Sequence, residues 1–160
     1  MNDLYSYHES EHLRLKKKKY VATSVGIFIA ALAVSIVLCF FVTAGNATLL
    51  QVINIILCSL GGCASLFLLF NVILPLHNRQ RYVSQVIGGK KKSICGVVTK
   101  IGGLITVSKN ISAYEITVKT DDETEILLYW DKEKEIPDIV GKNVSFETVQ
   151  NTVFGYEVEK

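Results

Sequence analysis

The chain has 160 residues, 49% of them apolar, and a formal net charge of +2 at pH 7. This length allows one small domain with accessory segments, and the apolar share is high for a soluble protein. The four cysteines do not indicate a disulfide framework, because three lie in long apolar runs and one lies in an expected strand.

The first 19 residues read as a basic cytosolic tail that contains HESEH at residues 8 to 12. On a helix, H-E-x-x-H places two zinc-binding histidines on one face and a glutamate beside them as general base. The candidates here are His8, Glu9 and His12, and His77 could complete a surface zinc site. A catalytic zinc also needs an orienting shell and a cleft, and we expect no fold around the tail. We therefore interpret the motif as a chance match and expect a protein without enzymatic activity, metal or cofactor.

Two uncharged runs follow, at residues 20–43 and 49–76. At about 1.5 Å per residue, each is long enough as a helix to cross a hydrocarbon core of roughly 30 Å. We predict two transmembrane helices over these ranges, joined by an external turn at residues 44–48. A cleaved signal peptide is the alternative for the first run, but its apolar region would span only about 7 to 15 residues.

Basic residues flank both runs on the same side, and the turn between them has none. The positive-inside rule therefore predicts a multi-pass plasma-membrane protein with both termini in the cytoplasm. Residues 77–92 read as a basic juxtamembrane linker, which either lies on the inner surface or forms a solvated stem. The residues expected to contact lipid headgroups are Lys16, Lys17, Lys18, Lys19, Arg79, Arg81, Lys90, Lys91 and Lys92.

Small residues recur at four-residue spacing in both runs, which is typical of helices that approach one another closely in lipid. The expected packing residues are Gly26, Ala30, Ala31, Ser35, Cys58, Gly61, Gly62 and Ser65. They favour pairing of the two helices with each other over an interface between chains. We also expect Asn54 to find a partner on the facing helix.

From Ser93 onward the apolar pattern changes to period two, which predicts short strands with one buried face. The expected strands are Ile94 to Ile101 continuing into Leu104 to Val107 after Gly102-Gly103, then Ile111 to Lys119, Thr124 to Trp130, Asn143 to Val149 and Val153 to Glu159. Five short strands at this spacing favour a small all-β barrel or sheet over residues 93–160.

The strand pattern resembles that of an OB-fold barrel. The resemblance covers residues 92–160 and rests on KSICGVVTKIGGLITV, on AYEITVKT with ETEILLYWD, and on the closing hairpin GKNVSFETVQNTVFGYEVE. It implies a five-stranded barrel, although the connector DKEKEIPDIVGK is too short for much more than one helical turn. A pleckstrin-homology-like domain is the alternative, but it would close with a helix.

OB-like domains often bind oligonucleotides, and the charge pattern disfavours this function here. Residues 1–92 have 10 basic and 3 acidic side chains, whereas residues 93–160 have 7 basic and 12 acidic ones. A phosphate-binding groove needs the opposite sign on the barrel. An acidic barrel on a basic membrane collar instead favours a protein partner with a basic patch.

The candidate docking face is the outward side of one strand, formed by Glu125, Leu127, Tyr129 and Asp131. We therefore expect a non-catalytic membrane protein that presents a small cytosolic β-barrel as an interaction module or accessory subunit, with lipids and a protein partner or a second copy as its contacts. The alternatives are a membrane-bound metal hydrolase that uses HESEH and a membrane-tethered nucleic-acid-binding barrel.

Overall fold

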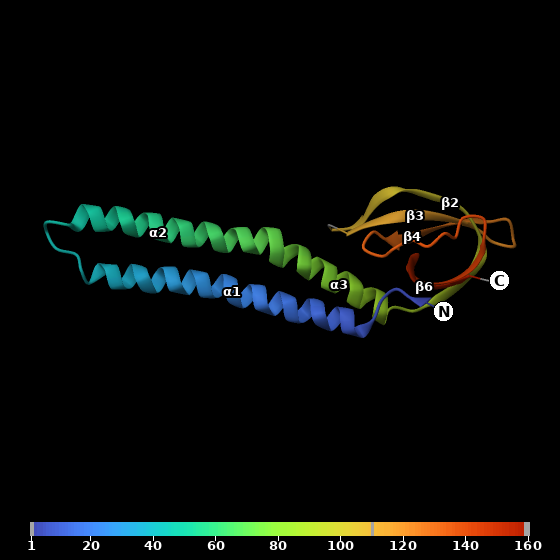
Figure 1. Ribbon diagram of the computed structural model, residues 1–160, viewed down its shortest axis with the longest axis horizontal. Helices are drawn as coiled ribbons and strands as arrows, with labels where there is room; N and C mark the ends of the chain where they lie inside the picture. The colour runs from blue at the N-terminus through green and yellow to red at the C-terminus, as the bar shows by residue number, and fades with distance from the viewer. Residues whose placement is uncertain (1, 110, 159–160) are drawn as a thin grey trace. The chain divides into compact units, whose positions relative to one another are not determined.

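The computed structural model describes residues 2–109 and 111–158, and these fall into two compact units. The helical unit comprises residues 14–77, and the β unit comprises residues 2–13 and 78–158. The elements in chain order (Figure 1) are β1 (Asn2–Asp3), α1 (Tyr7–Cys39), α2 (Ala47–Leu68), the π-helical turn η1 (Leu69–Ile73), α3 (Leu74–Gly88), β2 (Lys92–Ser108), β3 (Ile111–Lys119), β4 (Glu125–Asp131), β5 (Asn143–Val149) and β6 (Thr152–Val158).

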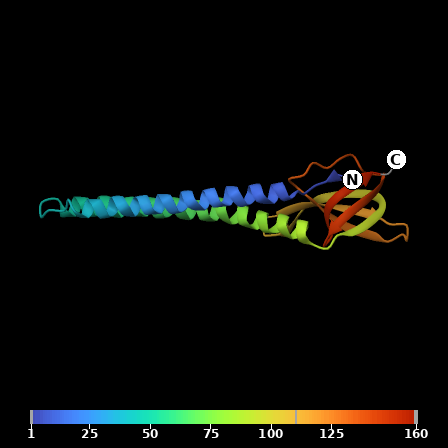
Figure 2. The same ribbon diagram turned by 90° about the horizontal axis from the view of Figure 1, so that it is seen from below.

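Within the helical unit, α1 and α2 lie side by side and run in opposite directions (Figures 1 and 2). Both helices are long and apolar enough to cross a membrane. Helix α1 begins well before the expected residue 20, because the charged stretch before the apolar run is also helical. It ends at Cys39, and the turn covers residues 40–46 rather than 44–48.

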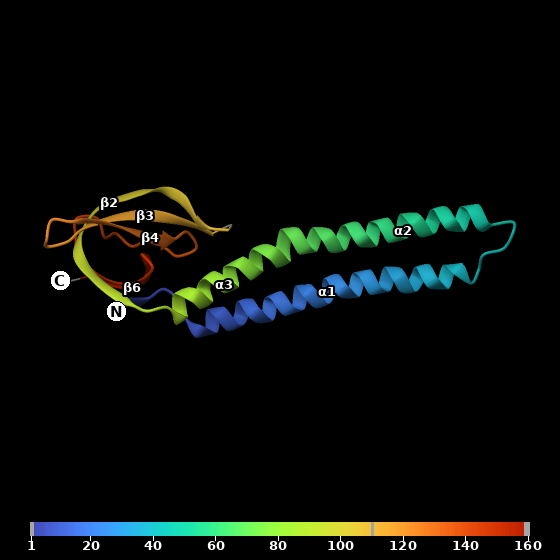
Figure 3. The same ribbon diagram turned by 180° about the vertical axis from the view of Figure 1, so that it is seen from behind.

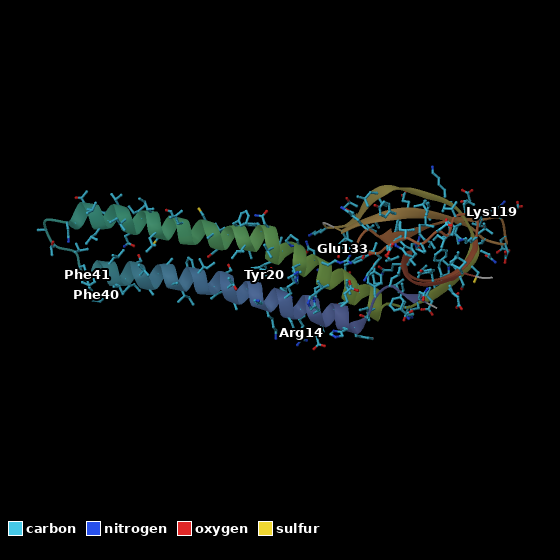
Figure 4. The ribbon with its side chains drawn as sticks, viewed as in Figure 1. Arg14, Tyr20, Phe40, Phe41, Lys119 and Glu133 are labelled. Carbon is cyan, nitrogen blue, oxygen red and sulfur yellow. The ribbon has the colours of Figure 1, made fainter. Side chains whose placement is uncertain are left out.

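Asn46 organises this turn. Its Oδ1 accepts a hydrogen bond from the Thr43 backbone N–H at 2.6 Å, and its Nδ2 donates to the Phe41 carbonyl at 3.1 Å. An asparagine side chain that bonds nearby backbone in this way stabilises a turn. Phe40 and Phe41 are strongly exposed beside it (Figure 4).

Small and polar residues mediate the contact between α1 and α2. A Cβ atom placed on Gly61 would lie 2.6 Å from the Cβ of Ala31, so the backbones approach closely at this point. Ser35 donates a hydrogen bond to Asn54 Oδ1, which confirms the expected partner for Asn54. Ser35 also lies 3.3 Å from Cys58 Sγ, and the Ser24 and Ser65 hydroxyls each donate to the other residue's carbonyl.

The remaining small residues are not used in the same way. Gly26 and Ala30 are exposed, and a Cβ atom placed on Gly62 would meet no atom within 4 Å. Five of the eight expected packing residues therefore contact the facing helix, and they belong to one stripe on each helix.

The second helical stretch runs from Ala47 to Gly88 and passes through Pro75. Proline has no N–H to donate to the carbonyl four residues earlier, and its ring crowds that carbonyl. The π-helical turn at Leu69–Ile73 ends two residues before the proline and includes Asn71, four residues before it. Widening the helix there relieves the crowding without ending the helix.

The β unit contains a sheet in the order β1-β6-β4-β3-β2-β5, in which β5 also pairs with β6 (Figure 3). All pairings are antiparallel except β4 with β6, which share a single parallel pair at Tyr129 and Thr152. The five expected strands are present, and the expected break at Gly102-Gly103 is an irregularity within the continuous strand β2. Glu159, the last residue of the expected final strand, lies outside the described residues.

The sixth strand, β1, was not expected. Its two residues pair with Tyr156 and Gly155 of β6, and the Leu4 backbone N–H donates to the Phe154 carbonyl at 2.8 Å. The expected unstructured tail is therefore, in residues 2–13, part of the β unit.

Two apolar clusters stabilise the β unit. One lies inside the sheet around the fully buried Trp130 and Phe146. The other joins Tyr5 of the N-terminal segment, Tyr82 and Val83 of α3, and Phe154 of β6. The segment after residue 77, expected as a basic linker on the inner surface or as a solvated stem, is thus helical through Gly88 and has one face buried against the sheet.

The close approach at Gly61 gives a test with a matched neighbour. We expect Gly61→Ala to destabilise the helical unit by about 1–3 kcal/mol, because the added methyl group overpacks against Ala31. Gly62→Ala should be neutral or stabilising, since alanine is favoured over glycine in a helix by up to about 1 kcal/mol. Unfolding of the detergent-solubilised protein with SDS, followed by circular dichroism, measures both. Equal effects at the two positions would contradict the α1–α2 contact.

Candidate functional site

The site begins at the first turn of α1. Ser6 precedes the helix, and its Oγ accepts a hydrogen bond from the Glu9 backbone N–H at 3.2 Å. A serine followed by glutamate three residues later is a typical helix start, because the serine satisfies a backbone donor that lacks a helical partner. Helix α1 therefore begins at a defined point next to HESEH, and the carboxylate of Glu9 is paired with Lys134, which follows β4.

The centre of the site is a buried ion pair between α3 and the end of β4. Arg79 Nη1 lies 2.5 Å from Asp131 Oδ2, and the two side chains are 8% and 1% exposed. The Tyr5 hydroxyl donates to the same carboxylate oxygen at 2.8 Å. Asp131 Oδ1 accepts from the Glu133 backbone N–H at 3.0 Å. Both carboxylate oxygens are therefore bonded, and three separate chain segments meet at one buried aspartate. We call Tyr5, Arg79 and Asp131 the buried triad.

A second layer of charges surrounds the buried triad. Lys134 Nζ lies 2.7 Å from Glu9 Oε2, and Arg79 Nη2 lies 3.3 Å from Glu133 Oε2 and 3.7 Å from Glu9 Oε1. Arg79 Nε and Nη2 nevertheless form no hydrogen bond of good geometry with a described residue. A buried guanidinium satisfied mainly at one nitrogen depends heavily on its carboxylate partner.

The environment of the triad shifts two pKa values. Burial raises the pKa of Tyr5 above its ordinary value, and neighbouring Tyr82 and Asp131 raise it further. Burial by itself lowers the pKa of Arg79, but the charges of Asp131 and Glu133 outweigh burial and raise it. Tyr5 is therefore a neutral hydrogen-bond donor, and Arg79 a permanent cation, throughout the physiological range.

HESEH contributes to this cluster through Glu9 and not through its histidines. His8 and His12 are exposed, while Glu9 is ion-paired with Lys134. Across residues 2–109 and 111–158, no group of three or more His, Cys, Asp or Glu side chains is placed to hold a metal ion. His77 lies in the helical unit with its Nδ1 3.5 Å from Lys17 Nζ. Glu9, the residue that a hydrolase would use as a general base, is ion-paired with Lys134.

Two expected surface residues are instead buried. Arg79 was expected at lipid headgroups and Asp131 on the docking face, yet each is the other's partner. The alternation of β4 places Asp131 outward, as expected, but the N-terminal segment and α3 cover that end of the strand. Both residues were therefore wrongly expected at the surface, and both are buried for the same reason, which is that they pair with each other.

The other expected surface residues are accessible. Glu125 and Leu127 are exposed on β4, and Tyr129 is partly exposed. Most of the expected headgroup residues are also exposed: Lys16, Lys18, Lys19, Arg81, Lys90, Lys91 and Lys92, with Lys17 partly buried. Lys91 is ion-paired with Glu147 at 2.9 Å and lies over the Phe154 ring.

Sequence reasoning missed three members of the site, namely Tyr5, Glu133 and Lys134. The Ser6-x-x-Glu9 pattern was a signal for a helix start within the tail. Nothing in the local sequence indicated the pairing of Tyr5 with Asp131, because the two residues are 126 positions apart.

Beside the triad lies a polar hollow of about 320 Å³ lined by Arg79, Ile111, Ser112, Asp131, Lys132 and Glu133. Its two cations and two carboxylates balance, so the hollow has no net preference for ligand charge. Comparison of the chain with protein-family models, with curated proteins and with solved structures found no match.

The ion pair can be tested with a double-mutant cycle. We expect Asp131→Leu and Arg79→Met each to destabilise the β unit by about 3–5 kcal/mol, because each leaves the other charge buried without its partner. The double variant Arg79→Met with Asp131→Leu should recover most of this loss, since an apolar pair of similar volume removes both charges together. Chemical denaturation of the solubilised protein measures the cycle. Additive losses would show that the pair is not coupled.

The raised pKa of Tyr5 gives a pH test. Its folded pKa lies above the unfolded value of about 10, so its contribution to stability is complete below pH 10 and is lost as the pH rises above that value. There the unfolded chain releases a proton that the folded chain keeps, and the loss is about 1.4 kcal/mol per pH unit for one group. We expect the Tyr5→Phe variant to have a lower free energy of unfolding than the unaltered protein at pH 8. Between pH 10 and 11.5, however, the free energy of unfolding should fall less in the variant than in the unaltered protein. Parallel profiles for the two proteins would contradict a buried Tyr5.

Proposed function

We propose that the chain is a non-catalytic membrane-anchored module, in which the helical hairpin spans the plasma membrane and the β unit presents a protein-binding face to the cytosol. The observation that carries the proposal is the membership of residues 2–13 and 78–88 in the β unit. These two segments lead into the two apolar helices, and one ionisable group from each, Glu9 and Arg79, is paired with β4 or the residues after it.

This pairing favours a presenting role over a catalytic one. Catalysis needs a titratable group that is accessible to substrate. Three of the ionisable side chains in the β unit, Glu9, Arg79 and Asp131, are instead ion-paired and hold chain segments together. The acidic balance of residues 93–160 further supports a protein partner with a basic surface over a nucleic acid.

We also propose that the sheet closes into an OB-like barrel. In support, each strand from β2 to β6 has at least two paired neighbours, and the pairings run β2–β3–β4–β6–β5 and back to β2. A circular set of pairings is what a closed barrel requires. The β4–β6 seam rests on one residue pair, and next to it the Leu127 carbonyl accepts a hydrogen bond from Asn151 Nδ2 at 3.2 Å.

The same seam supports β4 as the docking face. Leu127 is 46% exposed beside the incompletely paired strand edge, and Glu125 and Tyr129 lie two residues to either side. An exposed edge with an apolar side chain and a carboxylate can bind an extended basic segment through backbone hydrogen bonds.

Partner binding can be tested with a photo-reactive p-benzoylphenylalanine in place of Leu127, in the full chain and its native membranes. We expect irradiation to give one discrete cross-linked product, which the added change Glu125→Lys reduces. The control carries the same group in place of Val140, which is also apolar and is 49% exposed. No product from position 127, or the same products from both positions, would contradict a docking face on β4.

Membrane topology can be tested separately with cysteine labelling. In a variant that retains only Cys95, which is exposed on β2, a membrane-impermeant maleimide should react only after the cells are opened. In a variant whose single cysteine comes from Ala44→Cys in the turn, the same maleimide should label that cysteine on intact cells. Labelling of Cys95 on intact cells would contradict the cytosolic placement of the β unit.

A further inference from the structure

A second hollow in the β unit has a different charge from the one beside the triad. Its volume is about 250 Å³, and its lining residues are Asn78, Arg81, Tyr82, Gln85, Ser108 and Lys109. Four of these occupy one face of α3, at positions 78, 81, 82 and 85, and two belong to the end of β2 and the turn after it. The hollow therefore forms where α3 meets the β2–β3 connection.

The charge of this hollow is positive and uncompensated. Arg81 and Lys109 are both exposed, and neither forms an ion pair within residues 2–109 and 111–158. No lining residue is acidic, whereas the hollow beside the triad has one carboxylate for each cation. An anion is therefore attracted to this hollow and not to its neighbour.

The other lining groups supply hydrogen-bond donors. Asn78 and Gln85 have side-chain amides and Ser108 has a hydroxyl, and each can donate to an anionic oxygen. Tyr82 closes the floor, since it is 8% exposed and its hydroxyl lies 3.4 Å from Thr152 Oγ1. An arginine fork together with a lysine point charge and neutral donors is a typical phosphate-binding set. The volume is below the roughly 300–1,000 Å³ of drug-sized pockets and suits a compact polar group.

We propose that this hollow, which we call the α3 hollow, binds a phosphate group between Arg81 and Lys109. The chemistry is shared by a free phosphate and by the headgroup of an anionic phospholipid. A headgroup fits the position of Arg81 along the chain, five residues after Leu76, the last residue of the second apolar run. That is about 8 Å along a helix, comparable to the depth of the polar layer on each side of a bilayer. Only the lipid source rests on the proposed membrane function.

The test uses the full chain in an uncharged detergent, with backbone amide resonances followed by NMR. The two probes are inorganic phosphate and dihexanoyl phosphatidic acid, each compared with sodium acetate at the same ionic strength. We expect saturable shifts at residues 81, 85, 108 and 109. The double variant Arg81→Gln with Lys109→Gln should weaken binding by about tenfold or more, because both charge-assisted contacts are lost.

The control removes two positive charges elsewhere, through Lys100→Gln with Lys119→Gln. Lys119 lies at the opposite end of the β unit from Glu133, which borders α3 (Figure 4). We expect this variant to bind within about twofold of the unaltered protein, since screened charges at a distance contribute little. Both variants change exposed side chains, and an unchanged amide spectrum outside the hollow reports an intact fold.

The two probes distinguish the source of the phosphate. Saturable binding of both probes supports a site for phosphate as such, and binding of the phosphatidic acid alone supports a lipid headgroup. The proposal is overturned if neither probe gives saturable shifts at the α3 hollow, or if the control variant loses as much affinity as Arg81→Gln with Lys109→Gln. Because the detergent experiment requires no membrane, its failure would leave the cysteine-labelling result untouched.

Discussion

The ion pair between Arg79 and Asp131 is the interaction on which the arrangement of the β unit depends. It is buried, it joins α3 to β4, and it receives a hydrogen bond from Tyr5 of the N-terminal segment. Removing one charge would leave the other buried without its closest counter-charge, which costs far more than the pair contributes when intact. The folded β unit therefore requires both charges at the point where the three segments meet. The β unit is therefore one folded body, formed by the chain segments that precede and follow the helical hairpin in the sequence.

Much of the fold could be predicted from local pattern. The uncharged runs predicted two long apolar helices, and alternation from Ser93 onward predicted five strands, because burial of one face imposes a period on the sequence. Asn54 was correctly expected to bond the facing helix, since a polar amide in an apolar helix requires a partner. The extension of α1 back to Tyr7 and the strand β1 were missed, because a charged segment shows no apolar period even when it is helical.

The site could not be predicted, for a reason that Arg79 and Asp131 illustrate. Asp131 read correctly as lying on the outward side of its strand, whereas Arg79, expected at the surface, lies on the same face of α3 as the buried Tyr82, Val83 and Val86. The sequence contains no local sign that this face of α3 meets the outward side of β4. Arg79 and Asp131, 52 residues apart in the chain, are joined only by tertiary packing. In HESEH, by contrast, the local pattern predicts a site that the tertiary structure does not form. Its spacing matches a zinc motif, but Ser6 caps the start of the helix and Glu9 is ion-paired with Lys134. A short motif acquires its chemistry from its surroundings, and here these favour a structural role.

The most direct test of this account is hydrogen exchange of the N-terminal segment in the full-length protein. The Leu4 amide donates to Phe154, so we expect it to exchange as slowly as the amides of β6, and to lose that protection in Asp131→Ala before the sheet itself unfolds. Exchange of the Leu4 amide at the rate of an unfolded chain in the unaltered protein would contradict the account, because residues 2–13 would then be a free tail and the buried triad would not form.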